Sequence, residues 1–237
     1  MMANNETGAI NKIAEITRLV KAKDAICIVH TDASQAVGKI PVDVDALGVD
    51  LLTIAAHKLY GPKGIGALFI RNGTRINRFC DGGGQEHGRR AGTENVLLAV
   101  GFGAACEAAM ETCLKRTEDT LSLKREFLSK LKAHVPNLIV NGPLIDSGNC
   151  LPGALSVSVP NQQGHVLCTL AADKGVCFSA GAACHAHDMP TPSRVLMAMP
   201  GMTEARALGT IRLSIGRYTT AEDVDWASKV IVSALDV

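Results

Sequence analysis

One stretch of the sequence governs how the rest is interpreted: Ala55-Ala56-His57-Lys58-Leu59-Tyr60-Gly61-Pro62-Lys63-Gly64. The apolar run 51–56 leads into it with the length and composition of a buried strand, and a second such run covers 65–70. Lys58 therefore stands at the carboxyl end of a strand, where open α/β sheets bind ligands. Desolvation there would favour the neutral amine, which is a nucleophile for carbonyl carbon. A lone lysine in a loop is usually a solvated surface residue, so a functional role for Lys58 depends on the motifs that accompany it.

A carboxylate accompanies this lysine. The run 25–30 predicts another buried strand, and Asp32 follows it directly. Two consecutive strands thus end in an acid and an amine. Pyridoxal 5'-phosphate (PLP) requires such a pair: a lysine for its Schiff base, and an acid that keeps the pyridine nitrogen protonated so that the ring acts as an electron sink. Taken alone, Asp32 would be a helix cap or a turn residue.

Four motifs in order carry a resemblance to a known family: Asn4-Asn5-Glu6-Thr7-Gly8, Asp32-Ala33-Ser34-Gln35, His57 to Gly64, and Gly82-Gly83-Gly84-Gln85-Glu86. The chain resembles the NifS-like cysteine desulfurases and selenocysteine lyases of the class-V aminotransferases, from its first residues almost to its last. The resemblance implies an α/β PLP-dependent transferase fold of type I. We expect part of a large domain with a mainly parallel sheet, followed by a small C-terminal α/β domain.

The resemblance assigns roles around the cofactor. Lys58 forms the Schiff base, Asp32 faces the pyridine nitrogen, Asn5 and Gln35 hydrogen-bond the ring hydroxyl, and His57 is a further cofactor-binding residue. Members of this family often place a Ser or Thr shortly before that histidine to bind the phosphate. In this chain the two positions before it are alanines.

Thr93 is assigned, also by resemblance, to the cofactor phosphate of a partner subunit, which implies a homodimer. Arg212, in Arg212-Leu213-Ser214-Ile215, is expected to bind the substrate carboxylate, because a planar guanidinium grips that group bidentately. Cys184 is the expected catalytic thiol. Its loop consists of small residues, and His185 beside it could favour the thiolate. We assign no metal site, since no further ligand accompanies His185 and His187 at suitable spacing.

Composition sets the broad class. Of the 237 residues, 47% are hydrophobic and 20% charged, and the net charge of +1 gives no sign of a nucleic-acid or anionic-membrane partner. The 8 cysteines are scattered, which favours a reducing compartment, and we expect a cytoplasmic protein. We see no signal peptide and expect no run long and apolar enough to span a bilayer.

The element pattern predicts two domains, 1–111 and 112–237, with the boundary near Glu111. Helix 10–22 and strands 25–30 and 51–56 have βαβ order, which implies parallel pairing. The remaining predicted elements, in chain order, are helix 94–115, helix 118–134, strand 154–159, helix 164–174, strand 210–215 and helix 221–235.

The resemblance leaves the reaction open between alternatives. The motif Gly181-Ala182-Ala183-Cys184-His185 favours a selenocysteine lyase, which converts L-selenocysteine to L-alanine and reduced selenium. The alternatives are a cysteine desulfurase, in which Cys184 becomes a persulfide and passes sulfur to an acceptor protein, and a non-catalytic paralogue. The chain begins almost at the Asn4 motif, without the family's N-terminal segment that holds the cofactor phosphate. We therefore expect this chain alone to hold PLP weakly.

Overall fold

The structure, a computed structural model, describes residues 1–180 and 191–235. They form two compact units: Met1–Met2 with Asn11–Cys113, and Ala3–Ile10 with Leu114–Val237. The division lies close to the expected boundary near Glu111. The segment Ala3–Ile10 differs from our expectation, because it belongs to the second unit. Its backbone is bound there, with the Leu151 amide donating to the Gly8 carbonyl oxygen at 2.8 Å.

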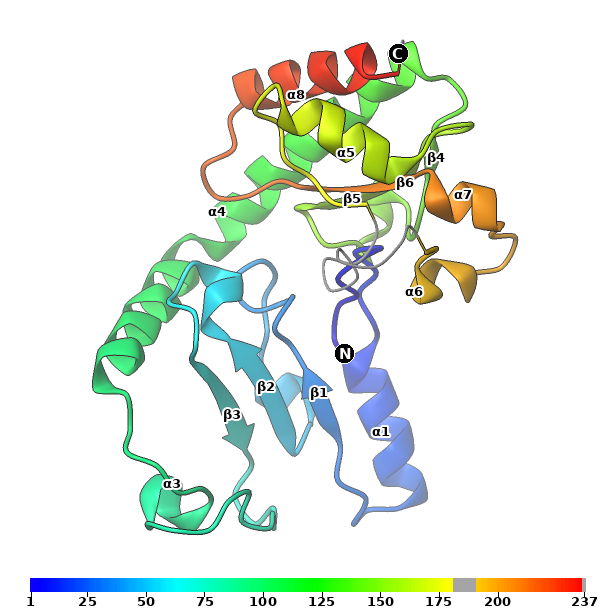
Figure 1. The fold of residues 1–237 in the computed structure, drawn as a ribbon. Helices are drawn as coiled ribbons and strands as arrows, with labels where there is room; N and C mark the ends of the chain where they lie inside the picture. Colours follow the sequence, from blue (N-terminus) through cyan, green and yellow to red (C-terminus); the bar gives the residue numbers. More distant parts are fainter. Residues whose placement is uncertain (181–190, 236–237) are drawn as a thin grey trace. The chain divides into compact units, whose positions relative to one another are not determined.

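The first unit contains a mixed three-stranded sheet. Its strands are β1 (His30–Asp32), β2 (Leu51–Ala55) and β3 (Gly66–Ile70), with β2 in the middle (Figure 1). β1 pairs with β2 in parallel, as the βαβ order predicts, whereas β2 and β3 are antiparallel. The other elements of this unit are α1 (Ile13–Lys23), α2 (Val44–Leu47), the 3-10 turn η1 (Ala56–Leu59) and α3 (Gln85–Gly88).

The strand expected over 25–30 is much shorter than predicted. Only His30 and the two residues after it pair with β2, and Ile26 and Ile28 are exposed. The cause lies at Asp50, just before β2. Its carboxylate accepts from the Val29 amide at 2.7 Å, and its own amide donates to the Val29 carbonyl at 2.9 Å. The backbone N–H and C=O of Val29 are thus bonded to Asp50, in the connection that precedes β2, and the pairing of β1 with β2 begins at the next residue, His30.

Helix α4 (Val96–His134) replaces the two helices predicted over 94–115 and 118–134. The predicted break is absent because residues 104–135 contain neither glycine nor proline, so nothing interrupts the helical hydrogen bonds. Phe102 and Ala109 on its first part pack with Ala56 and Leu59, which makes this the local core under η1. Helix formation therefore anchors the turn that carries Lys58.

The apolar first part of α4 was not anticipated. By length and composition alone, α4 is sufficient to cross a membrane, contrary to our expectation from the sequence. Its large side chains Val96, Leu97, Val100 and Met110 are exposed. Length and composition do not distinguish a membrane helix from a helix that packs at a protein interface.

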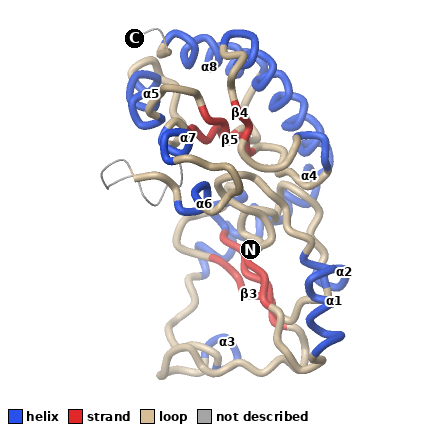
Figure 2. Tube along the Cα trace, turned by 90° about the vertical axis from the view of Figure 1, so that its right-hand side faces the viewer, coloured by secondary structure: helices blue, strands red, loops and turns tan. Residues whose placement is uncertain are grey.

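The second unit is an antiparallel sheet covered by helices. Its strands, in sheet order, are β4 (Ile139–Val140), β5 (Ala154–Ser158) and β6 (Thr210–Ser214). The remaining elements are the 3-10 turn η2 (Ile145–Ser147), α5 (Gly164–Ala172), α6 (Arg194–Met197), α7 (Glu204–Leu208) and α8 (Ala221–Ser233). Figures 1 and 2 show α5 and α8 on the same side of the sheet.

One hydrophobic core holds this second unit together. Alternating residues of β5 and β6 pack against the helices, and the last third of α4 completes the core. The fully buried residues of this core include Leu131, Leu155, Val157, Leu167, Ile211, Val224 and Ile231. The strands and helices predicted beyond 150 therefore form as the periodicity indicated, because each has one apolar face with a partner.

Candidate functional site

The turn that carries Lys58 is built from buried anchors and an exposed amine. Ala56 and Leu59 are buried, whereas Lys58 and His57 are exposed. Tyr60 ends the 3-10 turn in the left-handed region, and the Gly61 amide donates to the Ala56 carbonyl oxygen at 2.9 Å. A Cβ at position 61 would lie 3.0 Å from that same oxygen, so glycine is required. The Lys58 amine is accessible to a ligand, and the desolvation expected from the sequence is not found in this unit.

Asp32 closes β1 beside this turn. In the parallel register it lies opposite Thr53 of β2, five residues before Lys58. Partial burial opposes ionisation of the carboxyl, but hydrogen bonds from Ser34 outweigh it and lower the pKa of Asp32. The Ser34 amide donates to Oδ1 at 2.8 Å. At neutral pH the group is therefore a carboxylate, which is the form that can hold a pyridine nitrogen protonated.

Gln35 lies in the turn after Asp32, and its amide is already oriented. Lys39 Nζ donates to Gln35 Oε1 at 3.0 Å. Burial, followed by the positive charge of Lys58, lowers the pKa of Lys39 to about 8. Lys39 was not predicted as a site residue, because its contact with Gln35 depends on the turns of residues 34–39, in which Gly38 has a φ of +74°.

Two hydroxyl residues of the first unit lie on either side of Lys58 in the sequence. Thr53 is on β2, four residues before His57, and its Oγ1 lies 2.8 Å from the ring nitrogen Nε2 of His30. Thr93 is exposed, just before α4, where Asn95 Oδ1 accepts from the Leu98 amide at 3.1 Å and caps the helix. The role of Thr93 toward a partner subunit stays a prediction.

In the second unit, Arg212 and Asn5 are brought together across 207 positions of sequence. Arg212 Nη1 donates to the Asn5 carbonyl oxygen at 3.1 Å, and Nη2 donates to Ser179 Oγ at 3.3 Å. Backbone bonds between Ser179 and Arg212, at 2.7 and 3.2 Å, fix the strand position of the arginine. Arg212 Nε is buried and makes no hydrogen bond within the described residues. The guanidinium is thus held by two protein groups and retains an unused donor.

A side-chain turn shapes the segment that carries Asn5. Asn4 Oδ1 accepts from the amides of Glu6 and Thr7, both at 2.9 Å, and from the Thr7 hydroxyl at 3.2 Å. This is the turn that an asparagine forms with the backbone two and three residues later. Asn4 was quoted in the motif but given no role, although its spacing to Glu6 and Thr7 was a readable signal. The Glu6 carboxylate also accepts a hydrogen bond from the Ser193 hydroxyl.

Cys184, the predicted catalytic thiol, lies outside the described residues, as do His185 and His187. None of the seven other cysteines forms a disulfide within the described residues, and Cys27 is exposed because its segment is not part of β1. Burial, with a contribution from Cys177, raises the pKa of Cys168 to about 11. Burial also raises the pKa of Cys106. These two thiols are protonated at neutral pH and are poor nucleophiles.

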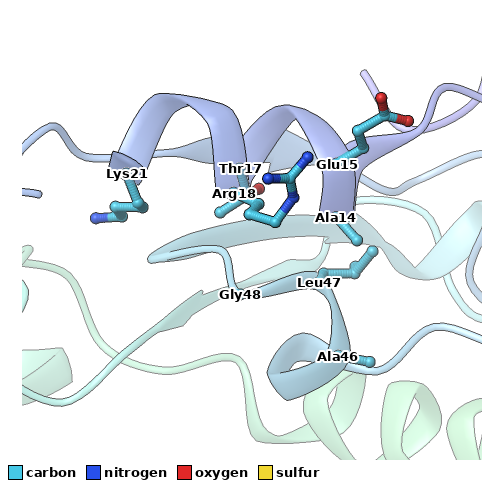
Figure 3. A pocket seen from close by; sticks show the side chains of 8 residues that line it. All are labelled: Ala14, Glu15, Thr17, Arg18, Lys21, Ala46, Leu47 and Gly48. Carbon is cyan, nitrogen blue, oxygen red and sulfur yellow. The ribbon is translucent and has the colours of Figure 1, made fainter. Parts of the chain in front are cut away.

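A hollow of about 460 Å³ lies between α1 and the end of α2 (Figure 3). Arg18 and Lys21 supply its positive charge, and Lys21 is paired with Asp50 at 2.7 Å. None of the predicted cofactor or substrate residues lines this hollow.

Comparison with known proteins places the chain in a family. Residues 1–226 match the family Aminotransferase class-V. The chain is 40% identical over 231 residues to the cysteine desulfurase IscS of Clostridium botulinum, covering 98% of the chain and 57% of that protein. It is 39% identical over 225 residues to the cysteine desulfurase NifS of Azotobacter vinelandii, covering 95% and 54%.

Solved structures agree with the sequence matches. A NifS-like protein superposes with a TM-score of 0.89 at 37% identity, covering all of this chain and 60% of the other. A NifS-like protein from Rickettsia africae gives 0.88 at 30% identity, covering 100% and 61%. The predicted α/β PLP-dependent fold is confirmed. The chain spans a little over half the length of the curated relatives it matches.

Proposed function

Because the chain belongs to the class-V aminotransferase family, we propose that it serves PLP-dependent removal of sulfur from L-cysteine, giving L-alanine and a persulfide on Cys184. Our first expectation from the sequence was the selenium reaction, but the relatives named above are cysteine desulfurases. The observation that carries the proposal is the pairing of β1 with β2, which sets an ionised Asp32 and the accessible amine of Lys58 at the ends of adjacent parallel strands.

The residues of the first unit fit the cofactor on which this family depends. PLP, when bound, supplies an electron sink for bonds to the substrate's α- and β-carbons. Asp32 would hold the pyridine nitrogen protonated, because its own carboxyl is held ionised. Lys58 would bind the cofactor through its amine and afterwards move a proton at the substrate α-carbon. Gln35 would donate a hydrogen bond to the ring hydroxyl oxygen, and Asn5, a residue of the second unit, is proposed to do the same.

Arg212 and Cys184 are proposed to act on the substrate. The guanidinium would bind the α-carboxylate with the donors that Asn5 and Ser179 leave available. The Cys184 thiolate would attack the substrate sulfur: a sulfur–sulfur bond forms, and the bond from sulfur to the β-carbon breaks. The electron pair stays with the three-carbon fragment, which takes up a proton and leaves as alanine. Cysteine and one thiol thus become alanine and one persulfide, without an external oxidant.

Alanine formation tests this proposal. Purified protein supplied with PLP and L-cysteine should form alanine, and it should carry one extra sulfur atom (about 32 Da), which a reductant removes. Arg212→Lys keeps the charge but loses the planar fork, and we expect a raised KM. Cys184→Ala should form no persulfide while still binding PLP. Alanine formation by Cys184→Ala at the unmodified rate would contradict the role of this thiol.

Selenocysteine is the second candidate substrate, and the wording of residues 181–185 favours it. A selenol is more acidic than a thiol, so selenium leaves with less help from a nucleophile. His185 could then serve as proton partner to Cys184. Alanine formed from selenocysteine and from cysteine, measured side by side, separates the two reactions. Faster turnover of selenocysteine would make selenium the substrate atom and would leave the roles of Lys58 and Asp32 unchanged.

We also propose that the protein acts as a cytoplasmic homodimer. The exposed apolar residues Val96, Leu97 and Val100 follow Thr93 directly, and burying them against a second copy would place Thr93 at that interface. Leu97→Glu should shift the sedimentation coefficient toward the monomer, whereas the same change on a charged face, Lys115→Glu, should not. A monomeric unmodified protein would refute the dimer.

A further inference from the structure

The hydrogen bond between Lys39 and Gln35 fixes which end of the Gln35 amide is available to a ligand. A lysine ammonium has three donors and no acceptor, so the atom 3.0 Å from Nζ has to be the amide oxygen. The amide nitrogen Nε2 consequently points elsewhere. It makes no hydrogen bond with any residue in the part of the chain that the structure describes. Gln35 therefore presents an NH₂ donor and no acceptor.

The turn that holds both side chains is rigid. The amides of Ala36 and Val37 donate to the Ala33 carbonyl at 2.8 and 3.0 Å, and the Lys39 amide donates to the Ala36 carbonyl at 3.0 Å. Ala33 and Ala36 are fully buried. Residues 34–39 form consecutive turns rather than a helix, with Gly38 in the left-handed region at φ +74° and Ala33 and Ala36 as a buried base, and this reversal of the backbone brings the Lys39 ammonium to the Gln35 amide oxygen.

We propose that Lys39 is a positioning residue, which orients the Gln35 amide so that its NH₂ group donates to the ring hydroxyl oxygen of PLP. This inference rests on the proposed function. The ring oxygen of the bound cofactor is an acceptor, so a flipped amide would place oxygen against oxygen and lose the bond. Lys39 prevents that flip without touching the cofactor.

The surroundings of Lys39 set the pH range in which this hydrogen bond has a fixed direction. Burial and the positive charge of Lys58 lower the pKa of Lys39 to about 8. Below that pH the group is an ammonium, which can only donate, so the Gln35 oxygen is its acceptor.

A double-mutant cycle tests this role. The variants are Lys39→Met, Gln35→Ala and the pair together, with Lys39→Arg as the rescue and exposed Lys23→Met as the charge control. The readout is the pH midpoint of the absorbance change of the cofactor bound at Lys58. Losing one donor to the ring oxygen should raise this midpoint by about half to one pH unit in Lys39→Met, the equivalent of one hydrogen bond. Lys39→Arg and Lys23→Met should stay near the unmodified value.

The outcome in the Gln35→Ala background is decisive. If Lys39 acts through Gln35, adding Lys39→Met there should move the midpoint no further. An equal shift in both backgrounds would overturn the proposal, because Lys39 would then act on Lys58 directly through its charge. No shift in either background would also overturn it. Absence of any Lys58-bound cofactor in the unmodified protein at saturating PLP would instead overturn the proposed function, a result that is distinguishable from both.

A cofactor-free measurement completes the test. In apoprotein labelled with ¹⁵N, the side-chain NH₂ of Gln35 should be well ordered, and Lys39→Met should raise its mobility on the picosecond to nanosecond timescale. Lys39→Arg should preserve the order, since a guanidinium also only donates. An equally ordered Gln35 NH₂ in Lys39→Met would refute the orienting role.

Discussion

Replacing Asn4 with alanine removes the side-chain turn that shapes the Asn5 segment. Three hydrogen bonds are lost at once: those from the Glu6 and Thr7 amides, both at 2.9 Å, and that from the Thr7 hydroxyl at 3.2 Å. Glu6 and Thr7 are only 5% and 7% exposed, so water replaces the lost acceptor poorly. A buried donor left without a partner costs about 1–3 kcal/mol. Because the three donors share one acceptor atom and the Thr7 hydroxyl can rotate to another acceptor, we expect a loss of about 2 kcal/mol rather than the sum.

The single tryptophan of the sequence makes this loss measurable in the right unit. Trp226 lies in α8, and Asn4 belongs to the same unit. Urea unfolding followed by tryptophan fluorescence should show a midpoint lower by about 1 M, if the slope is near 2 kcal/mol/M. Lys174→Met is the control in the same unit. It removes one exposed hydrogen bond, from Lys174 Nζ to Ser233 Oγ, and should change stability by less than about 0.5 kcal/mol.

Asn4→Ala should have a second effect, on cofactor binding. Asn5 can contact the cofactor only if the turn holds it in place, so Asn4→Ala should also weaken PLP binding. The affinity would be measured by fluorescence titration without urea. An Asn4→Ala protein with unchanged midpoint and unchanged affinity would show that the turn is not what holds this segment.

Two further predictions concern the second unit. Gly142→Ala should cost at least about 2 kcal/mol in the same unfolding assay, because φ at Gly142 is +103° and a Cβ there would lie 2.7 Å from the Thr7 carbonyl oxygen. Gly148→Ala is the control: φ is +72° but the space around it is open, so it should cost about 1 kcal/mol. Equal losses in the two variants would refute the clash at Gly142. Hydrogen bonding to Lys130 lowers the pKa of Asp225 to about 2, below the ordinary 3.8. The stability that this ionised carboxylate contributes is therefore complete above about pH 4 and is lost as the pH falls through 2. Between pH 5 and pH 2.5 the urea midpoint should fall less in Asp225→Asn than in the unmodified protein, and an identical fall would contradict this role.

Local sequence patterns predicted the second unit and the Lys58 turn well. The strands β5 and β6 and the helices α5 and α8 each have an alternating or helical apolar face, and that face has a partner in the core. The abrupt end of the run 51–56 in His57-Lys58 predicted a strand end, and the structure turns there. Patterns of this kind are reliable because burial enforces them.

Features that depend on contacts between residues far apart in the sequence could not be predicted from local patterns. The run 25–30 has strand composition, but the bonds from Asp50 to Val29 decide where pairing starts. The assignment of Ala3–Ile10 to the second unit depends on backbone bonds near Leu151. Likewise, the contact between Arg212 and Asn5 spans most of the chain. No local pattern encodes such pairings, because they are set by the fold.

The most direct measurement of the central claim is the covalent position of the cofactor. The protein would be incubated with PLP, reduced with borohydride and digested, and the modified peptide would be identified by mass spectrometry. We expect the pyridoxyl group on Lys58, with none on that peptide in Lys58→Ala, although Lys39 and Lys63 remain present. A pyridoxyl group mainly on another lysine, or a reducible cofactor band of undiminished strength in Lys58→Ala, would contradict the assignment of this site.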